Sequence, residues 1–279
     1  MKRLQKNLRE YKFNEKGNQM QLAVYIIVVL YGLAVGSFVC VCIDRIPEGT
    51  DIVKTPSSCP KCGRRLRAGE LMPVFSWLFL RGKCHGCGEH ISIQYPLVEL
   101  SNAVLWLLCV WRVGNGLDLL TISTTTILAV LIACFTMSVL LAIAVTDAKT
   151  GIIPVGYNIA LLVLGVFHLG ITGEYTLHLI GAIAVSLPLY GIYLISNATA
   201  IGGGDIKFLV GAGVLLGWKL IILAFVTACI LGTIVHGFRM IIGKASRTVR
   251  LGPYLAAGAA LSWLFGNAAI AWYIHIAGL

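Results

Sequence analysis

Two aspartates border long apolar stretches of this chain, and paired carboxylates are groups that general acid–base chemistry uses. Asp147 closes the apolar stretch 124–146, and Asp205 stands in an apolar region directly after a run of glycines. Inserting a charged side chain into a membrane-spanning segment costs about 2.5–3.5 kcal/mol of free energy. An aspartate in or beside such a segment therefore indicates a functional site. The glycines allow unwound backbone and the close approach of a second chain. They are Gly202, Gly203 and Gly204.

Four cysteines form two C-x-x-C pairs, each followed by a glycine, in the one long hydrophilic loop. This spacing is typical of a zinc ribbon, in which two tight turns supply four thiolates to a closed tetrahedral site. The pairs could instead be redox-active or disulfide-bonded, and His85 or His90 could replace a thiolate. A reducing compartment favours metal binding over disulfides. The four cysteines are Cys59, Cys62, Cys84 and Cys87.

Composition places these residues in an integral membrane protein. Hydrophobic residues make up 58% of the 279 residues and charged residues only 12%, against roughly 25% charged in soluble domains. A bilayer crossing needs roughly 20 apolar residues. We therefore predict an all-α polytopic protein with about eight transmembrane or membrane-embedded helices, the 206–216 stretch being a half-helix or part of a longer broken element. The candidate segments are 22–43, 96–113, 124–146, 157–172, 177–196, 206–216, 220–242 and 251–274.

The positive charges predict the orientation of these segments. Lysines and arginines concentrate in the loop 44–95 and in a short loop that holds Lys244, Arg247 and Arg250. The alternate loops carry only Arg112 and Lys219, so the positive-inside rule places the two basic loops in the cytoplasm. Both aspartates then emerge at the cytoplasmic face. The basic N-terminal tail does not fit this orientation, because it would lie on the non-cytoplasmic side if the first segment crosses the membrane fully.

The domain organisation follows from these boundaries. We expect a basic tail over 1–20, a first membrane helix over 21–43, a cytoplasmic zinc-binding loop over 44–95 and a membrane-embedded core over 96–279. Between the cysteine pairs, residues 70–82 are too apolar for a solvated linker, so they are expected to lie on the membrane surface or to pack on the helices. A loop of this size without a large core depends on its metal to fold.

Several motifs, in order from residue 32 onward, resemble those of the type IV prepilin leader peptidases, which are membrane aspartyl proteases of the glycine-aspartate type. The match includes the cysteine loop and Thr146-Asp147 with Ile153-Pro154. Cys40 and Val155 depart from the family pattern, and neither change touches the aspartates. The remaining matched motifs are Gly36-Ser37-Phe38, Asp44-Arg45-Ile46-Pro47, Tyr95-Pro96-Leu97-Val98-Glu99-Leu100, Gly202-Gly203-Gly204-Asp205-Ile206-Lys207 and Gly252-Pro253-Tyr254.

The resemblance implies that Asp147 and Asp205 form a catalytic dyad in the cytoplasmic (inner) membrane of a bacterium. One carboxylate keeps a proton while the other activates water. The glycines, Lys207 and Pro154 would line the active-site loop. The implied substrate is a prepilin or pseudopilin with a basic leader. The resemblance also implies N-methylation of the new amino terminus with S-adenosylmethionine. Candidate methyltransferase or leader contacts are Glu99, Glu70 and Asp44.

Other interpretations stay open. Each aspartate alone fits a structural role, Asp147 at a helix end beside Lys149 and Asp205 as a helix cap. A proton-coupled transporter would use paired aspartates as ion ligands, although inverted repeats are not visible. A preflagellin-type protease is the nearest alternative. Nucleic-acid binding is not expected, because the loop aromatics look directed toward membrane lipid. No motif indicates an oligomeric state.

Overall fold

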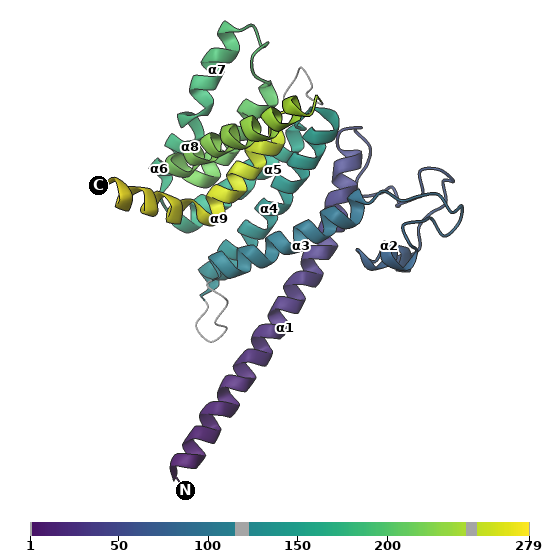
Figure 1. The fold of residues 1–279 in the computed structure, drawn as a ribbon, viewed down its shortest axis with the longest axis vertical. Coiled ribbons are helices and arrows are strands. Elements are labelled where there is room, and N and C mark those ends of the chain that lie inside the picture. The colour runs from purple at the N-terminus through teal and green to yellow at the C-terminus, as the bar shows by residue number, and fades with distance from the viewer. Residues whose placement is uncertain (1, 115–122, 244–249, 279) are drawn as a thin grey trace.

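The computed structural model describes residues 2–114, 123–243 and 250–278, with side chains described from residue 19 onward. This part of the chain contains helices and no strand (Figure 1). The elements in order are α1 (Lys2–Arg45), η1 (Ala68–Leu71), α2 (Phe75–Phe79), α3 (Gln94–Val113), α4 (Thr124–Thr150), α5 (Val155–Thr172), α6 (Tyr175–Ala184), α7 (Ser186–Ile195), α8 (Gly203–Ile241) and α9 (Gly252–Ala277).

Seven of the described helical stretches are long and apolar enough to cross a membrane, which confirms the predicted class of polytopic helical protein. They differ from the eight predicted segments at one place. The predicted segments 206–216 and 220–242 belong to the single element α8. Helix α8 is nevertheless broken between these two segments, because Gly217 has the non-helical angles φ 76° and ψ 170°.

The chain reverses its direction at Gly217. Before the break, Gly204 faces Ile153 and Gly211 faces Leu161, so the first part of α8 runs parallel to α5. After the break, the order of the contacts is inverted: Gly258 of α9 packs on Ala224 and Gly232 packs on Tyr254 of α9. The second part of α8 is therefore antiparallel to α9. At 1.5 Å per residue the first part is only about 20 Å long, which agrees with the predicted half-helix.

Proline explains a second break. The predicted segment 177–196 consists of α6 and α7, which meet at Val185 (φ −107°, ψ −39°). Pro188 lacks an N–H and its ring clashes with the carbonyl four residues earlier, at Ala184, the last residue of α6. In Figure 1, α7 points away from the other helices, and its apolar side chains Leu187 and Ile195 are exposed.

The remaining helices bring the end of α4 and the starts of α8 and α9 to one end of the bundle. The N-terminus of α1 lies far from this end in Figure 1, because α1 continues without a break through the basic tail to Lys2. Helix α4 packs against α1, α3, α5 and α9. Its last turn therefore lies at the centre of the bundle end, beside the starts of α8 and α9.

Candidate active site

Asp147 lies in the last turn of α4 and is buried, with 4% of its surface exposed. Its Oδ2 accepts a hydrogen bond of 3.1 Å from the backbone N–H of Gly252, the first residue of α9. The first N–H groups of a helix lack intrahelical partners and attract anions. Nearby, the Arg250 guanidinium donates to the carbonyl oxygen of Ala148. The end of α4 is therefore joined to the start of α9.

Asp205 occupies the first turn of α8, after the extended residue Gly202. It is half-buried, and its backbone N–H donates to the Gly202 carbonyl at 3.1 Å. The carboxylate folds back over Gly202, where an added methyl group would lie 3.0 Å from Oδ2. Asp147 and Asp205 are close enough to interact electrostatically. The fold thus brings the two predicted aspartates together from different helices.

The other residues predicted for this loop take different places. Gly204 packs against Ile153, which precedes Pro154, the residue directly before α5. Pro154 therefore lies beside the start of α8. Lys207 is exposed, and two residues along a helix correspond to about 200° around its axis. Lys207 therefore points away from Asp205, a direction that suits contact with a phospholipid better than contact with the aspartates.

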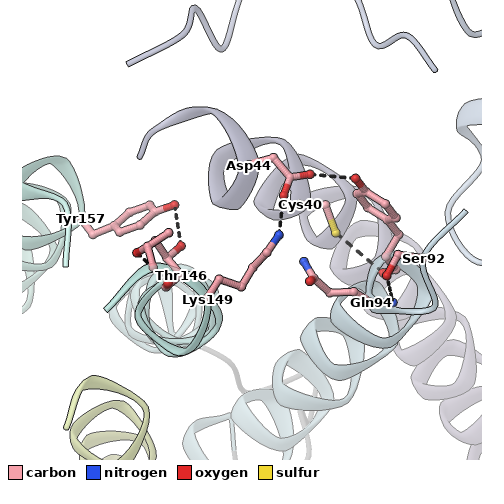
Figure 2. A network of polar contacts seen from close by, with 9 residues as sticks. Cys40, Asp44, Ser92, Gln94, Thr146, Lys149 and Tyr157 are labelled. Carbon is pink, nitrogen blue, oxygen red and sulfur yellow. Dashed lines mark hydrogen bonds and ion pairs between the residues drawn. The ribbon is translucent and has the colours of Figure 1, made fainter. Parts of the chain in front are cut away.

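A polar network joins the end of α4 to α1 and α3 (Figure 2). Asp44, in the last turn of α1, accepts hydrogen bonds from Lys149 Nζ at 2.9 Å and from the Tyr95 hydroxyl at 2.9 Å. Lys149 lies two residues after Asp147. Both oxygens of Asp44 are thus occupied, so its predicted contact with a leader peptide would require competition with Lys149.

Glu99 ties the cysteine loop to the helices. It is buried in the second turn of α3, with 7% exposure. Its Oε2 accepts the backbone N–H of Val74 at 2.6 Å. Gly36 permits this junction, since an added methyl group there would lie 2.8 Å from the Glu99 Cα.

Glu70 lies farther along the same loop, in η1. Its carboxylate accepts from Arg64 at 2.5 Å and from the backbone N–H of Arg67 at 2.8 Å. The Arg64 guanidinium, and then the Arg67 N–H, hold the pKa of Glu70 below its ordinary value. Glu70 therefore braces the loop, and its predicted roles in methyl transfer or leader binding stay predictions.

The four predicted cysteines converge, with all their sulfur atoms within 4.8 Å of one another. Cys59 Sγ and Cys87 Sγ are 3.8 Å apart, which equals the sulfur spacing of about 3.8 Å in a tetrahedron with 2.3 Å zinc–sulfur bonds. Each pair sits in a matching turn that ends in a glycine with positive φ, Gly63 and Gly88. The donor set fits a divalent metal such as zinc, and no histidine is needed.

Backbone N–H groups prepare the first cysteine of each pair for metal binding. The N–H groups of Cys87 and Gly86 lower the pKa of Cys84 to about 6. Those of Cys62 and Lys61 lower the pKa of Cys59 in the same way. The thiolate is the form that binds a metal, so the turns favour the ligand state before any ion arrives.

Sequence reasoning missed three contacts of this site. The N–H of Gly252 on Asp147, the Lys149–Asp44 ion pair and the Val74 N–H on Glu99 join residues that are far apart in the chain. The sequence contains one local signal for the contact between Gly252 and Asp147. A Gly-Pro pair at the start of an apolar stretch indicates a helix N-terminus, and such an end binds carboxylates.

Fold and site together define a polytopic membrane protein with interacting aspartates and a cysteine-rich loop at one end of its bundle. Two family models match the chain: the bacterial peptidase A24 N-terminal domain over residues 30–113 and the type IV leader peptidase family over 134–237. The chain therefore belongs to the type IV leader peptidase family, as its motifs indicated. No solved structure matches it.

Curated relatives agree over most of the chain. A prepilin leader peptidase/N-methyltransferase of Bacillus subtilis is 33% identical, and the alignment covers 90% of this chain and 98% of the relative. Proteins of the same name from Dickeya chrysanthemi and Pseudomonas putida are 31% and 29% identical. These alignments cover 85% and 89% of this chain, and 90% and 93% of the relatives.

Proposed function

We propose that this protein is a membrane aspartyl endopeptidase that removes the basic leader from type IV prepilins or pseudopilins. The names of the relatives suggest the substrate and the reaction. The observation that carries the proposal is the pairing of Asp147 and Asp205, which come from different helices and interact at one bundle end. A structural aspartate at a helix terminus needs no second carboxylate beside it.

The proposed chemistry uses one ionised and one protonated carboxyl group. The ionised group takes a proton from water while the water oxygen bonds to the scissile carbonyl carbon. The protonated group donates to the developing oxyanion. When the carbon–nitrogen bond breaks, a proton passes to the leaving amine. The N–H of Gly252 fixes the orientation of the Asp147 carboxylate during these steps.

The leader junction fits the placement of the pair. A prepilin of the kind implied by the family has a basic leader followed by an apolar helix in the membrane. The pair lies at helix ends rather than at mid-membrane, where transporters place their ion ligands. The charge distribution supports a cytoplasmic location for this end, since the opposite end has Arg112 and Lys219 as its loop cations. The first helix is the exception, because its basic tail does not follow the positive-inside rule.

We propose zinc as the structural metal of the cysteine loop, held by its four thiolates. N-methylation of the new amine is proposed from the names of the relatives alone. The described residues do not contain a strand and so lack a glycine-rich nucleotide turn. A cavity of about 350 Å³ near Ser92 and Val145 has no charged group in its lining.

The test is co-expression of the protein with a prepilin, followed by intact-mass analysis of the pilin. We expect Asp147→Asn and Asp205→Asn each to abolish loss of the leader, because either change removes one half of the acid–base pair. Glu174→Gln serves as the control, since Glu174 precedes α6 at the other end of the bundle. This variant should process the prepilin normally.

Membrane levels of each variant must match the wild type for the comparison to hold. Normal cleavage by either aspartate variant would contradict the proposed dyad. A product heavier by one methyl group in the wild type would support the second activity independently of the first, and an unmethylated product would remove it from the proposal.

A further inference from the structure

Helix α2 presents an apolar face that no part of the described chain covers. Phe75, Leu78 and Phe79 are 45%, 57% and 83% exposed. These positions follow the i, i+3, i+4 spacing of one helix face. The opposite face is occupied, because Trp77 donates its indole N–H to the Ile91 carbonyl at 3.1 Å and packs on Gly82.

The depth of α2 relative to the bundle is fixed by Glu99. Its carboxylate binds the N–H of Val74, the residue directly before α2. Glu99 lies five residues into α3, about 7 Å below the start of that helix. At this depth α3 exposes Leu97 and Leu100, at 54% and 52%. In Figure 1, α2 correspondingly lies level with α3 rather than at the tip of the cysteine loop.

The backbone before α2 is bent sharply to reach this place. The N–H of Phe75 donates to the carbonyl of Pro73 at 2.6 Å, which closes a γ-turn around Val74 (φ 60°, ψ −50°). A β-branched residue rarely adopts a positive φ, and such strain persists only where the surroundings impose it. The N–H of Val74, the central residue of this turn, is the group that Glu99 binds.

Two basic residues come soon after the apolar helix in the chain. Arg81 and Lys83 follow α2 directly, are exposed, and take part in none of the salt bridges found in the described ranges. Apolar side chains beside free cations are the pattern by which interfacial helices bind anionic membranes. Binding to a protein partner would not require α2 to lie at the same depth as the lipid-facing side of α3.

We propose that α2 is an in-plane lipid anchor, with Phe75, Leu78 and Phe79 inserted into the leaflet at the aspartate end of the bundle. Arg81 and Lys83 then lie among anionic headgroups. The buried Glu99 holds the anchor at its depth through Val74. The anchor keeps the cysteine loop against the membrane next to the paired aspartates. This inference does not rest on the proposed peptidase activity, and its test uses no substrate.

The test places 4-trifluoromethyl-phenylalanine at position 79 of the full chain, in nanodiscs that contain phosphatidylglycerol. Two paramagnetic reagents then report on its surroundings by fluorine NMR: a lipid with a nitroxide near the top of its acyl chain, and a water-soluble gadolinium chelate. The same label at position 53 is the control, because Val53 is 82% exposed in the same loop but lies outside α2.

We expect the nitroxide lipid to broaden the signal from position 79 at least several-fold more than that from position 53. The gadolinium chelate should give the reverse order. Equal broadening of both positions by the chelate would overturn the proposal, since α2 would then face water. Protection of position 79 from both reagents would also overturn it, because a second copy or another protein would then cover the face.

A pair of variants tests the role of Glu99. With the label at position 79, Glu99→Leu removes the acceptor for the Val74 N–H, whereas Glu99→Gln keeps a side-chain oxygen there. We expect the leucine variant to gain broadening by the chelate and the glutamine variant to resemble the wild type. If both variants keep full lipid contact, Glu99 does not set the depth of the anchor.

Discussion

At the scale of single residues, the geometry of the paired aspartates depends on a backbone group. Gly252 donates its N–H to Asp147, and an added methyl group at position 252 would lie 2.7 Å from the Asp147 Cγ. We expect Gly252→Ala to lower kcat/KM for prepilin cleavage at least tenfold, which corresponds to about 1.4 kcal/mol of lost transition-state stabilisation. Gly170→Ala is the matched control, because an added methyl group there meets nothing within 4 Å. Equal activity of the two variants would show that the contact is dispensable.

The ion pair between Asp44 and Lys149 gives a second prediction for single residues. The pair is partly exposed, with side-chain exposures of 35% and 43%, so it contributes about 0.2–1 kcal/mol. We expect Lys149→Met to reduce kcat about two- to fivefold with little change in KM, because the end of α4 loses a tether to α1. The swapped pair Asp44→Lys with Lys149→Asp should recover part of the loss in the same assay. A rise in KM alone would instead support a contact between Asp44 and the leader.

At the scale of elements, the reversal of α8 requires a residue without a side chain. Gly217 has φ 76° and ψ 170°, a region that only glycine adopts readily, at a cost of order 1–3 kcal/mol for other residues. We expect Gly217→Ala to lower the thermal stability of the detergent-solubilised protein. Gly191→Ala, in the lipid-exposed helix α7, has open space around it and should leave the melting temperature unchanged. Similar melting of both variants would contradict the reversal.

The break in α8 also explains the position of a buried histidine in α6. A reversal removes the intrahelical partners of the preceding carbonyl groups, and an unpaired carbonyl in lipid costs several kcal/mol. His178 Nδ1 lies 2.7 Å from the Val214 carbonyl oxygen, and the ring of His168 packs edge-on against the ring of His178, with centroids 5.5 Å apart. The His178 imidazole therefore replaces a partner that the helix no longer supplies.

Much of the element structure was predictable, because apolar length is a local property. The segments 96–113 and 124–146 agree with α3 and α4 to within a few residues at most ends. Contacts between elements were not predictable in this way. Gly252 and Asp147 are 105 residues apart, and nothing in either local sequence specifies the other. The class of fold and the convergence of the cysteines are confirmed, whereas the catalytic roles of the aspartates stay predictions.

At the scale of the whole molecule, the cysteine loop and the bundle have different sources of stability. The bundle buries a continuous apolar core that extends from α1 to α9. The loop has few buried apolar side chains, and the Val74 N–H attaches it to α3 through Glu99. We therefore expect zinc to stabilise the loop strongly and the bundle only slightly, since a small unit without its own core gains its folding free energy from the metal.

Removal of the metal tests whether the loop and the bundle are stabilised separately. We expect elemental analysis of the wild type to give one equivalent of zinc. The double variant Cys59→Ser with Cys84→Ser should lose this zinc, and its loop should become sensitive to trypsin while the bundle melts near its usual temperature. Cys229→Ser, which changes an exposed cysteine outside the cluster, should keep the zinc and the protease resistance. Because Asp147 and Gly252 lie in the bundle, their contact should survive the loss of the metal. If the bundle melts together with the loop, the two units form one cooperative structure, and zinc at the membrane surface supports the paired aspartates as well.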